Sequence, residues 1–132
     1  MKKQARRLVA LLIVSLACLP RIVEIDQDDR TGLILVWPWS SGFVEFVNSV
    51  TGGRVLISFK PVWKFSHFRA YTDDSTENYY TSGTYEWNGL LGTESESELR
   101  YCSIQGIRFK LGSFEQEVIN GCLRARIVWP PF

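Results

Sequence analysis

The residues best suited to chemistry lie in one polar stretch of the chain, residues 70–87. Asp73, Asp74 and Glu77 stand close together there and are flanked by tyrosines. Carboxylates among aromatic rings can bind a cation or the polar end of a small ligand. Their order lacks the D-x-D-x-D-G spacing of a calcium loop, so no metal site is indicated. Two interpretations stay open: a ligand site that includes Asp73, Asp74, Tyr79 and Tyr80, or a solvated turn between two aromatic strands.

His67 is the only histidine and the other candidate for acid–base chemistry. Lone histidines on strands are mostly structural, and no Ser-His-Asp spacing, G-x-S-x-G motif or phosphate loop accompanies this one. The sequence therefore predicts a protein that is not an enzyme and needs no cofactor. The alternative is a small extracytoplasmic enzyme that uses His67 or the Asp73, Asp74 and Glu77 cluster.

Asn48 is a polar residue on a largely apolar strand face. In the segment 43–50, Asn48 shares its side with Val44, Phe46 and Val50. A buried amide must find hydrogen-bond partners, because leaving it unpaired costs about 1–3 kcal/mol. Asn48 is therefore either a structural amide that binds the backbone of the next turn or a polar group displayed in a pocket. Ser49 is a ligand candidate beside it.

Cys102 and Cys122 are separated by 20 residues, and each lies in a strand-like run. In an exported protein they predict a disulfide, which would stabilise the fold by roughly 3 kcal/mol. The alternative is two buried thiols on neighbouring strands. Neither cysteine has the spacing of a metal ligand.

On the last strand, Arg124 and Arg126 share one side. With Lys64 or Arg69 they could accept an anion, or they face water.

The first twenty residues form a separate unit. Four basic residues precede residue 8, and residues 8–19 are uncharged and mostly apolar. This run is short for a bilayer span and typical of a secretory signal. We predict a signal peptide or membrane anchor over 1–20, with the protein secreted or held at the outer face of the cytoplasmic membrane. Cys18 is a lipidation candidate, although Ser15 stands where a lipobox prefers leucine; a buried N-terminal helix is the alternative.

Charge excludes a nucleic-acid partner. The whole chain has a net charge of +1, but without Lys2, Lys3, Arg6 and Arg7 it has 11 basic and 14 acidic residues. The remaining 21–132 domain thus has no broad cationic surface for a phosphate backbone.

The elements that must position these residues are mainly strands. After residue 21 no sustained helical period occurs, whereas short β-patterned runs recur between Gly, Asn, Asp and Ser. We predict one all-β domain, an antiparallel β-sandwich or flattened barrel of about eight strands. The expected strands include one at 33–37 that is buried on both faces or central, two hairpin arms at 43–50 and 54–63, an aromatic one within 79–89 and one at 99–111 that has a bend or bulge at Gly106. On the last strand, 122–129, Leu123, Ala125, Ile127 and Trp129 are expected to face the core.

One segment resembles a known family. The stretch LILVWPWSSGFVEFVNSVTGGRV is similar to the start of domain-of-unknown-function family 1850, whose strand ends in His-Ser-Val before a turn. Here Ser49 and Val50 match that motif, and Asn48 stands in place of the histidine. Members are small secreted or membrane-anchored β domains, often encoded beside TRAP-type transporters. The resemblance covers roughly residues 20–90, and it implies a partner in a membrane transport system.

Together these observations predict a non-catalytic accessory or binding protein that contacts the membrane through its N-terminal segment. Its small-molecule ligand stays open. A second alternative is an interaction module without a small ligand, which would meet its partner by strand addition at a sheet edge.

Overall fold

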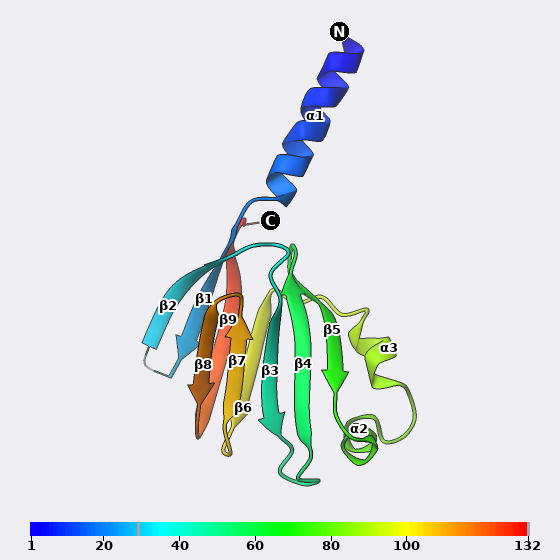
Figure 1. Cartoon of the computed structure of the whole chain (residues 1–132), viewed down its shortest axis with the longest axis vertical. Coiled ribbons are helices and arrows are strands. Elements are labelled where there is room, and N and C mark those ends of the chain that lie inside the picture. Colours follow the sequence, from blue (N-terminus) through cyan, green and yellow to red (C-terminus); the bar gives the residue numbers. More distant parts are fainter. Residues whose placement is uncertain (29, 132) are drawn as a thin grey trace.

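Two antiparallel sheets face each other in this computed structural model, which describes residues 1–28 and 30–131. One sheet has the strand order β2-β1-β9-β6 and the other β5-β4-β3-β7-β8 (Figure 1). The strands of the first sheet are β1 (Arg21–Gln27), β2 (Arg30–Val36), β6 (Glu98–Ser103) and β9 (Gly121–Trp129). Those of the second are β3 (Gly42–Val47), β4 (Arg54–Pro61), β5 (Phe65–Tyr71), β7 (Ile107–Leu111) and β8 (Phe114–Val118). The predicted β-sandwich is confirmed, with nine strands in the described residues.

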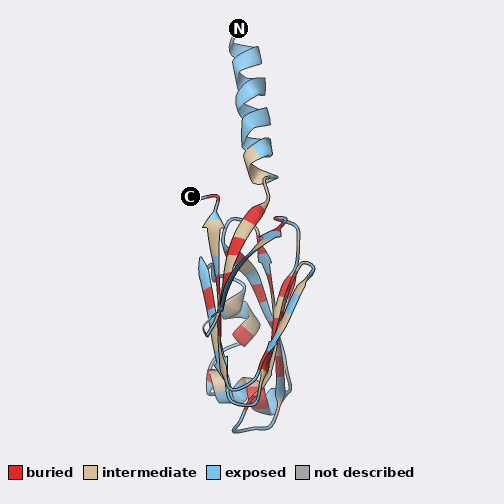
Figure 2. Cartoon of the chain, turned by 90° about the vertical axis from the view of Figure 1, so that its left-hand side faces the viewer, coloured by how far each residue is buried: buried red, intermediate tan, exposed pale blue. Residues whose placement is uncertain are grey.

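The core lies between the two sheets and takes buried residues from both of them. Figure 2 shows these buried residues along the strands of both layers. Its centre is aromatic: Phe59 contacts Phe65, Phe68 and Phe109, with ring centroids 5.5–6.1 Å apart. Burying one such side chain contributes about 1.5–3 kcal/mol, so this cluster is a main source of stability.

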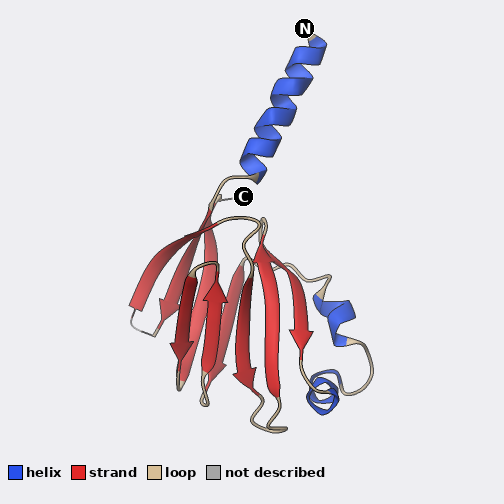
Figure 3. Cartoon of the chain, in the orientation of Figure 1, coloured by secondary structure: helices blue, strands red, loops and turns tan. Residues whose placement is uncertain are grey.

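Two short helices cover the side of the sandwich next to β5 (Figure 3). They are α2 (Asp74–Thr81) and α3 (Trp87–Leu91). The interpretation of residues 70–87 as a solvated turn between two aromatic strands is therefore wrong, and so is the aromatic strand expected within 79–89. Asp73 caps α2 by accepting a hydrogen bond from the Thr76 backbone N–H at 2.7 Å, and Asp74 and Glu77 lie favourably in its first turn. Trp87 then buries its ring against the sandwich.

Strand β2 lies at the edge of its sheet, so the prediction of a buried central strand at 33–37 is wrong. Leu33 and Leu35 are 66% and 58% exposed. Only alternate residues of β2 face the core, Ile34 partly and Val36 completely. An uninterrupted apolar run does not distinguish burial on both faces from an exposed apolar face.

The core face predicted for the last strand holds for part of its length. Leu123 and Ala125 are fully buried and Ile127 packs against the core, but Trp129 is 44% exposed. A register shift between Ile22 and Val23 in the pairing of β1 with β9 explains the change, because it turns the end of β9 over.

The segment 99–111 is two strands in different sheets, not one bent strand. Between β6 and β7 the chain turns at residues 104–106, where Gly106 has φ +119°. This conformation favours glycine, which explains its position at the crossing from one sheet to the other.

The predicted disulfide is confirmed. Cys102 and Cys122 are directly opposite each other on β6 and β9 and are bonded.

The first element of the chain is α1 (Lys2–Ala17). All of its residues are described, and none of them is buried. Helix α1 projects from one end of the sandwich (Figure 1). Within the described part of the chain, no helix is both long and apolar enough to cross a membrane.

Candidate functional site

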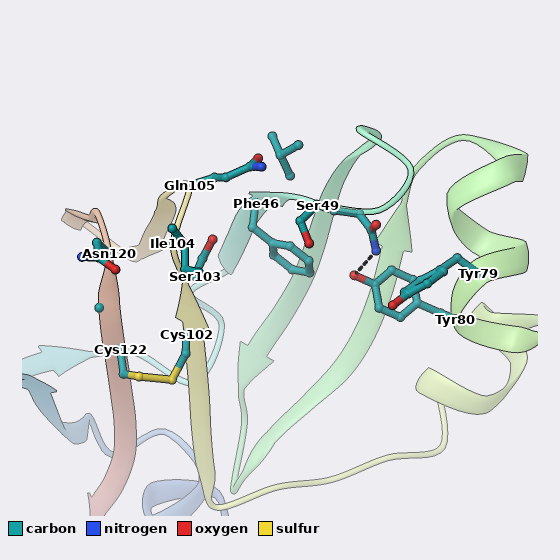
Figure 4. A pocket seen from close by; sticks show the side chains of 13 residues that line it. Phe46, Ser49, Tyr79, Tyr80, Cys102, Ser103, Ile104, Gln105, Asn120 and Cys122 are labelled. Atoms are coloured by element: carbon teal, nitrogen blue, oxygen red, sulfur yellow. Dashed lines mark hydrogen bonds between the residues drawn. A yellow bond between two sulfur atoms is a disulfide. The ribbon is translucent and has the colours of Figure 1, made fainter.

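An open cleft of about 670 Å³ lies at the end of the sandwich opposite α1. It separates the end of β6 from α2, and β3 from the other sheet forms its floor. Figure 4 shows the cystine on one side of the cleft, Tyr79 and Tyr80 on the other, and Phe46 between them. The lining residues are Phe46, Val47, Asn48, Ser49, Tyr79, Tyr80, Cys102, Ser103, Ile104, Gln105, Asn120, Gly121 and Cys122.

Asn48 holds two parts of the cleft wall together. Its Oδ1 accepts hydrogen bonds from the backbone N–H groups of Val50 and Thr51, at 2.8 and 2.9 Å. Its Nδ2 donates to the hydroxyl of Tyr80 at 3.0 Å. The structural interpretation of the amide is thus confirmed, because Asn48 is 6% exposed and fixes the turn. Asn48 also lies among the residues that line the cleft.

The tyrosine wall is positioned by the packing of α2 on α3. Tyr80 stacks on buried Trp87, with ring centroids 4.6 Å apart and planes inclined by 23°. Tyr79 meets Tyr80 edge to face at 5.3 Å and is half exposed. Tyr80 is thus held by stacking on one side and by Asn48 at its hydroxyl, whereas Tyr79 exposes aromatic surface in the cleft lining.

The turn between β3 and β4 packs closely against α2, and this contact positions the tyrosine wall relative to Asn48. A Cβ atom on Gly53 would stand 1.9 Å from Oγ1 of Thr76 and 2.5 Å from Oδ2 of Asp73. Thr51 adds a hydroxyl–hydroxyl hydrogen bond to Thr76 at 2.8 Å. Gly52 supplies the positive φ of the turn, +73°, and Gly53 supplies the space.

The opposite wall consists of the disulfide and two turns. The Cys102–Cys122 bond joins β6 to β9 at the point where both strands reach the cleft. Ser103 accepts a hydrogen bond from the Gly106 N–H at 3.3 Å, which orders the turn that carries Ile104 and Gln105. Asn120, with φ +52°, precedes Gly121 in the turn between β8 and β9.

The chemical character of the lining is neutral. The described residues that line the cleft include two tyrosines, two asparagines, a glutamine and two serines, but no charged side chain. Amide and hydroxyl groups both donate and accept hydrogen bonds. Beside aromatic and aliphatic surface, they suit an uncharged polar ligand with an apolar face.

The predicted acidic cluster has a structural role. Hydrogen bonds from Thr76, chiefly from its backbone N–H, hold the pKa of Asp73 below its ordinary value. Glu77 accepts a hydrogen bond from the Trp87 N–H at 3.4 Å. Asp73, Asp74 and Glu77 all lie outside the cleft lining, so only Asn48, Ser49, Tyr79 and Tyr80 of the predicted ligand residues are brought together.

His67 also lies away from the cleft. It is exposed, has φ +57° and sits in a β-bulge, where β4 and β5 shift register between Ser58 and Lys60. Its Nδ1 is 2.9 Å from Oγ of Ser66. In the described residues no group of three or more His, Cys, Asp or Glu side chains could hold a metal ion.

Arg124 and Arg126 are occupied by acidic neighbours on the outer face of their sheet. Arg124 pairs with Asp26, with Glu24 at 3.6 Å and with Glu98 at 3.8 Å. Arg126 pairs with Glu24 at 3.1 Å. Hydrogen bonds from Thr31 and then Arg124 lower the pKa of Asp26. This network, not an anion shared with Lys64 or Arg69, accounts for the two arginines.

Several cleft residues were not expected from the sequence: Phe46, Val47, Ser103, Ile104, Gln105, Asn120 and Gly121. Two local signals do mark their turns, Gln105-Gly106 and Asn120-Gly121, since both pairs suit tight turns. Nothing in the linear sequence shows that these two turns meet α2.

Comparison with known proteins gives no relative: no family model, curated protein or solved structure matches this chain.

Proposed function

We propose that this protein is a non-catalytic extracytoplasmic binding domain whose cleft takes a small, uncharged polar ligand with an apolar face, such as a sugar ring. The observation that carries the proposal is the cleft itself, with neutral hydrogen-bonding groups facing an exposed tyrosine. A sugar presents hydroxyl groups around its edge and C–H groups on its face, which match amides and an aromatic ring respectively.

The location is part of the proposal. The N-terminal segment carries a basic start and an apolar run, and Cys102 and Cys122 form a disulfide of the kind that persists in oxidising compartments. The resemblance of residues around Asn48 to a family encoded beside TRAP-type transporters supports a role as accessory protein of a membrane solute-transport system.

The arrangement at Asn48 favours binding over proton transfer. An amide does not titrate and so cannot act as a general acid or base near neutral pH, and both of its polar atoms are already engaged in the structure. The hydroxyl of Tyr80, which accepts from Asn48, can still donate its own proton to a ligand in the cleft.

A titration followed by amide NMR tests the proposal, with glucose and N-acetylglucosamine as neutral probes and glutamate as a charged one. We expect the sugars to shift signals from residues 46–49, 79–80, 102–105 and 120–122. Ser103→Phe, which fills the cleft, should abolish these shifts. Ser113→Phe is the matched control, because Ser113 is exposed in the β7–β8 turn and outside the cleft lining. Shifts caused equally by glutamate, or unchanged in Ser103→Phe, would contradict the proposal.

A further inference from the structure

Four of the five tryptophans lie at the end of the sandwich from which α1 projects, and we call them the tryptophan collar. Their exposed fractions are substantial: 43% for Trp37, 63% for Trp39, 40% for Trp63 and 44% for Trp129. The fifth, Trp87, is buried beside Tyr80 near the cleft. Large exposed aromatic side chains gathered at one end of a domain indicate an interaction surface.

The start of β1 brings the collar together. Ile22 pairs with Leu35 on β2 and with Trp129 on β9, so these three residues form a row across the sheet. Trp37 follows β2 directly and stacks on Trp39, with ring centroids 5.3 Å apart. The guanidinium of Arg21 lies 4.6 Å from the ring centroid of Trp63.

Arg21 also holds the C-terminal end of α1 close to the collar. Its fully buried side chain donates hydrogen bonds to the carbonyl oxygens of Val62 and Leu19, both at 2.6 Å, and of Ala17 at 3.3 Å. A guanidinium at the C-terminal end of a helix also complements the helix dipole. The last turn of α1, at its C-terminal end, therefore lies close to the collar.

We propose that the collar lies in the headgroup region of a lipid membrane, so that the domain itself contacts the bilayer and its cleft faces away from it. Indole rings, apolar with one N–H donor, concentrate at membrane–water interfaces. Apolar side chains of α1, including Leu8, Leu11 and Leu12, are exposed along the helix that projects from this end of the sandwich (Figure 1). A second copy of the chain docked on the collar would leave α1 in water, whereas a lipid surface covers both at once.

Charge at this end indicates which lipids suffice. Lys64 stands beside Trp63, but Glu96 pairs with Phe65 at the start of β5, and Glu94 and Glu98 are its neighbours in sequence. The collar thus has no cationic excess that would need anionic lipids. Its contact depends on indole partitioning, and it should persist on neutral phosphatidylcholine and at high salt.

Quenching of tryptophan fluorescence tests the proposal, with the full chain reconstituted in phosphatidylcholine vesicles whose acyl chains are brominated near the headgroup. Helix α1 contains no tryptophan, so its own insertion gives no signal. We expect strong quenching, and the Trp39→Phe/Trp129→Phe double variant should lose roughly half of it, because two of four collar rings are gone. Trp87→Phe is the control and should leave the quenched signal unchanged.

Three outcomes would overturn the proposal. The first is tryptophan emission that brominated lipid does not quench. The second is quenching that the double variant keeps. The third combines two results: sedimentation shows a dimer that the double variant abolishes, and vesicles cause no quenching. Together these results would assign the collar to contact with a second copy of the chain. Circular dichroism of each variant verifies that the sandwich is folded.

Discussion

The Nδ2 atom of Asn48 donates a hydrogen bond to the hydroxyl of Tyr80 at 3.0 Å, across 32 residues of sequence. This bond connects the turn after β3 to α2 and so determines how far the tyrosine wall stands from the floor of the cleft. Asn48 is nearly buried and uses its other polar atom for two backbone N–H groups. The conformation of the turn and the shape of the cleft therefore depend on the same side chain.

Replacing Asn48 should destabilise the protein more than replacing its partner. Asn48→Ala leaves two backbone N–H groups without their acceptor, and we expect a loss of about 2 kcal/mol in the free energy of unfolding. Tyr80→Phe keeps the stacking on Trp87 and removes one hydroxyl, so about 1 kcal/mol is expected. Urea denaturation of both variants measures these values; equal losses would mean that the turn does not depend on Asn48.

Gly53 should tolerate no side chain. Gly53→Ala places a methyl group within 1.9 Å of the Thr76 hydroxyl, so α2 must move or the strain remains. We expect a destabilisation of about 1–3 kcal/mol. Gly32→Ala is the matched control, since a Cβ there meets nothing within 4 Å, and its effect should stay within about 0.5 kcal/mol. Similar melting temperatures for the two variants would refute the close approach of the turn to α2.

The disulfide should account for a large part of the stability. The Cys102→Ser/Cys122→Ser variant should lose roughly 3 kcal/mol, because its unfolded chain is no longer closed into a loop. Cys18→Ser is the control, because Cys18 is an exposed free thiol outside the sandwich. Alkylation of the unfolded chain without reductant should modify Cys18 alone; three modified cysteines would show that the disulfide is absent.

Acid should weaken the cap of α2. The pKa of Asp73 is lower in the folded chain than its ordinary 3.8, so the charged form is stabilised by folding. That stabilisation is fully present above about pH 3.8 and is lost as the pH falls through the lower, folded value. Asn also caps helices but does not titrate, so Asp73→Asn should show a shallower loss of stability below pH 4 in thermal melts. If the melting temperatures of both proteins fall in the same way as the pH is lowered, the acid sensitivity does not come from Asp73.

Much of the sandwich could be predicted from the sequence, because strands with one buried face alternate visibly. The pairing of Cys102 with Cys122 was also predictable, since both cysteines lie in strand-like runs at a suitable separation. The helix α2 was missed, although Asp73 and the acidic first turn are an N-terminal signal. Aromatic residues at 79–87 suggested a strand. In the structure Tyr80 lies on α2 and Trp87 on α3, and the turn between the two helices brings their rings into contact.

Other features depend on tertiary context that a linear pattern does not contain. The run at 33–37 reads as buried, but its place at a sheet edge leaves Leu33 and Leu35 exposed. Of the predicted ligand-binding candidates, Asn48, Ser49, Tyr79 and Tyr80 lie in the cleft lining, whereas Asp73 and Asp74 do not. The opposite wall comes from two turns that only sheet pairing brings near Tyr80, so no local signal could connect them.

The most direct measurement for the proposed binding function of the cleft is mass spectrometry of the small molecules released from the full chain after purification from native membranes. Three forms should be compared: the unchanged chain, Ser103→Phe, which fills the cleft, and Ser113→Phe, which does not. The cleft predicts one uncharged polar compound that the unchanged chain and Ser113→Phe carry and Ser103→Phe lacks. A compound retained by Ser103→Phe at the same level, or a charged compound dependent on Ser103, would contradict the assignment.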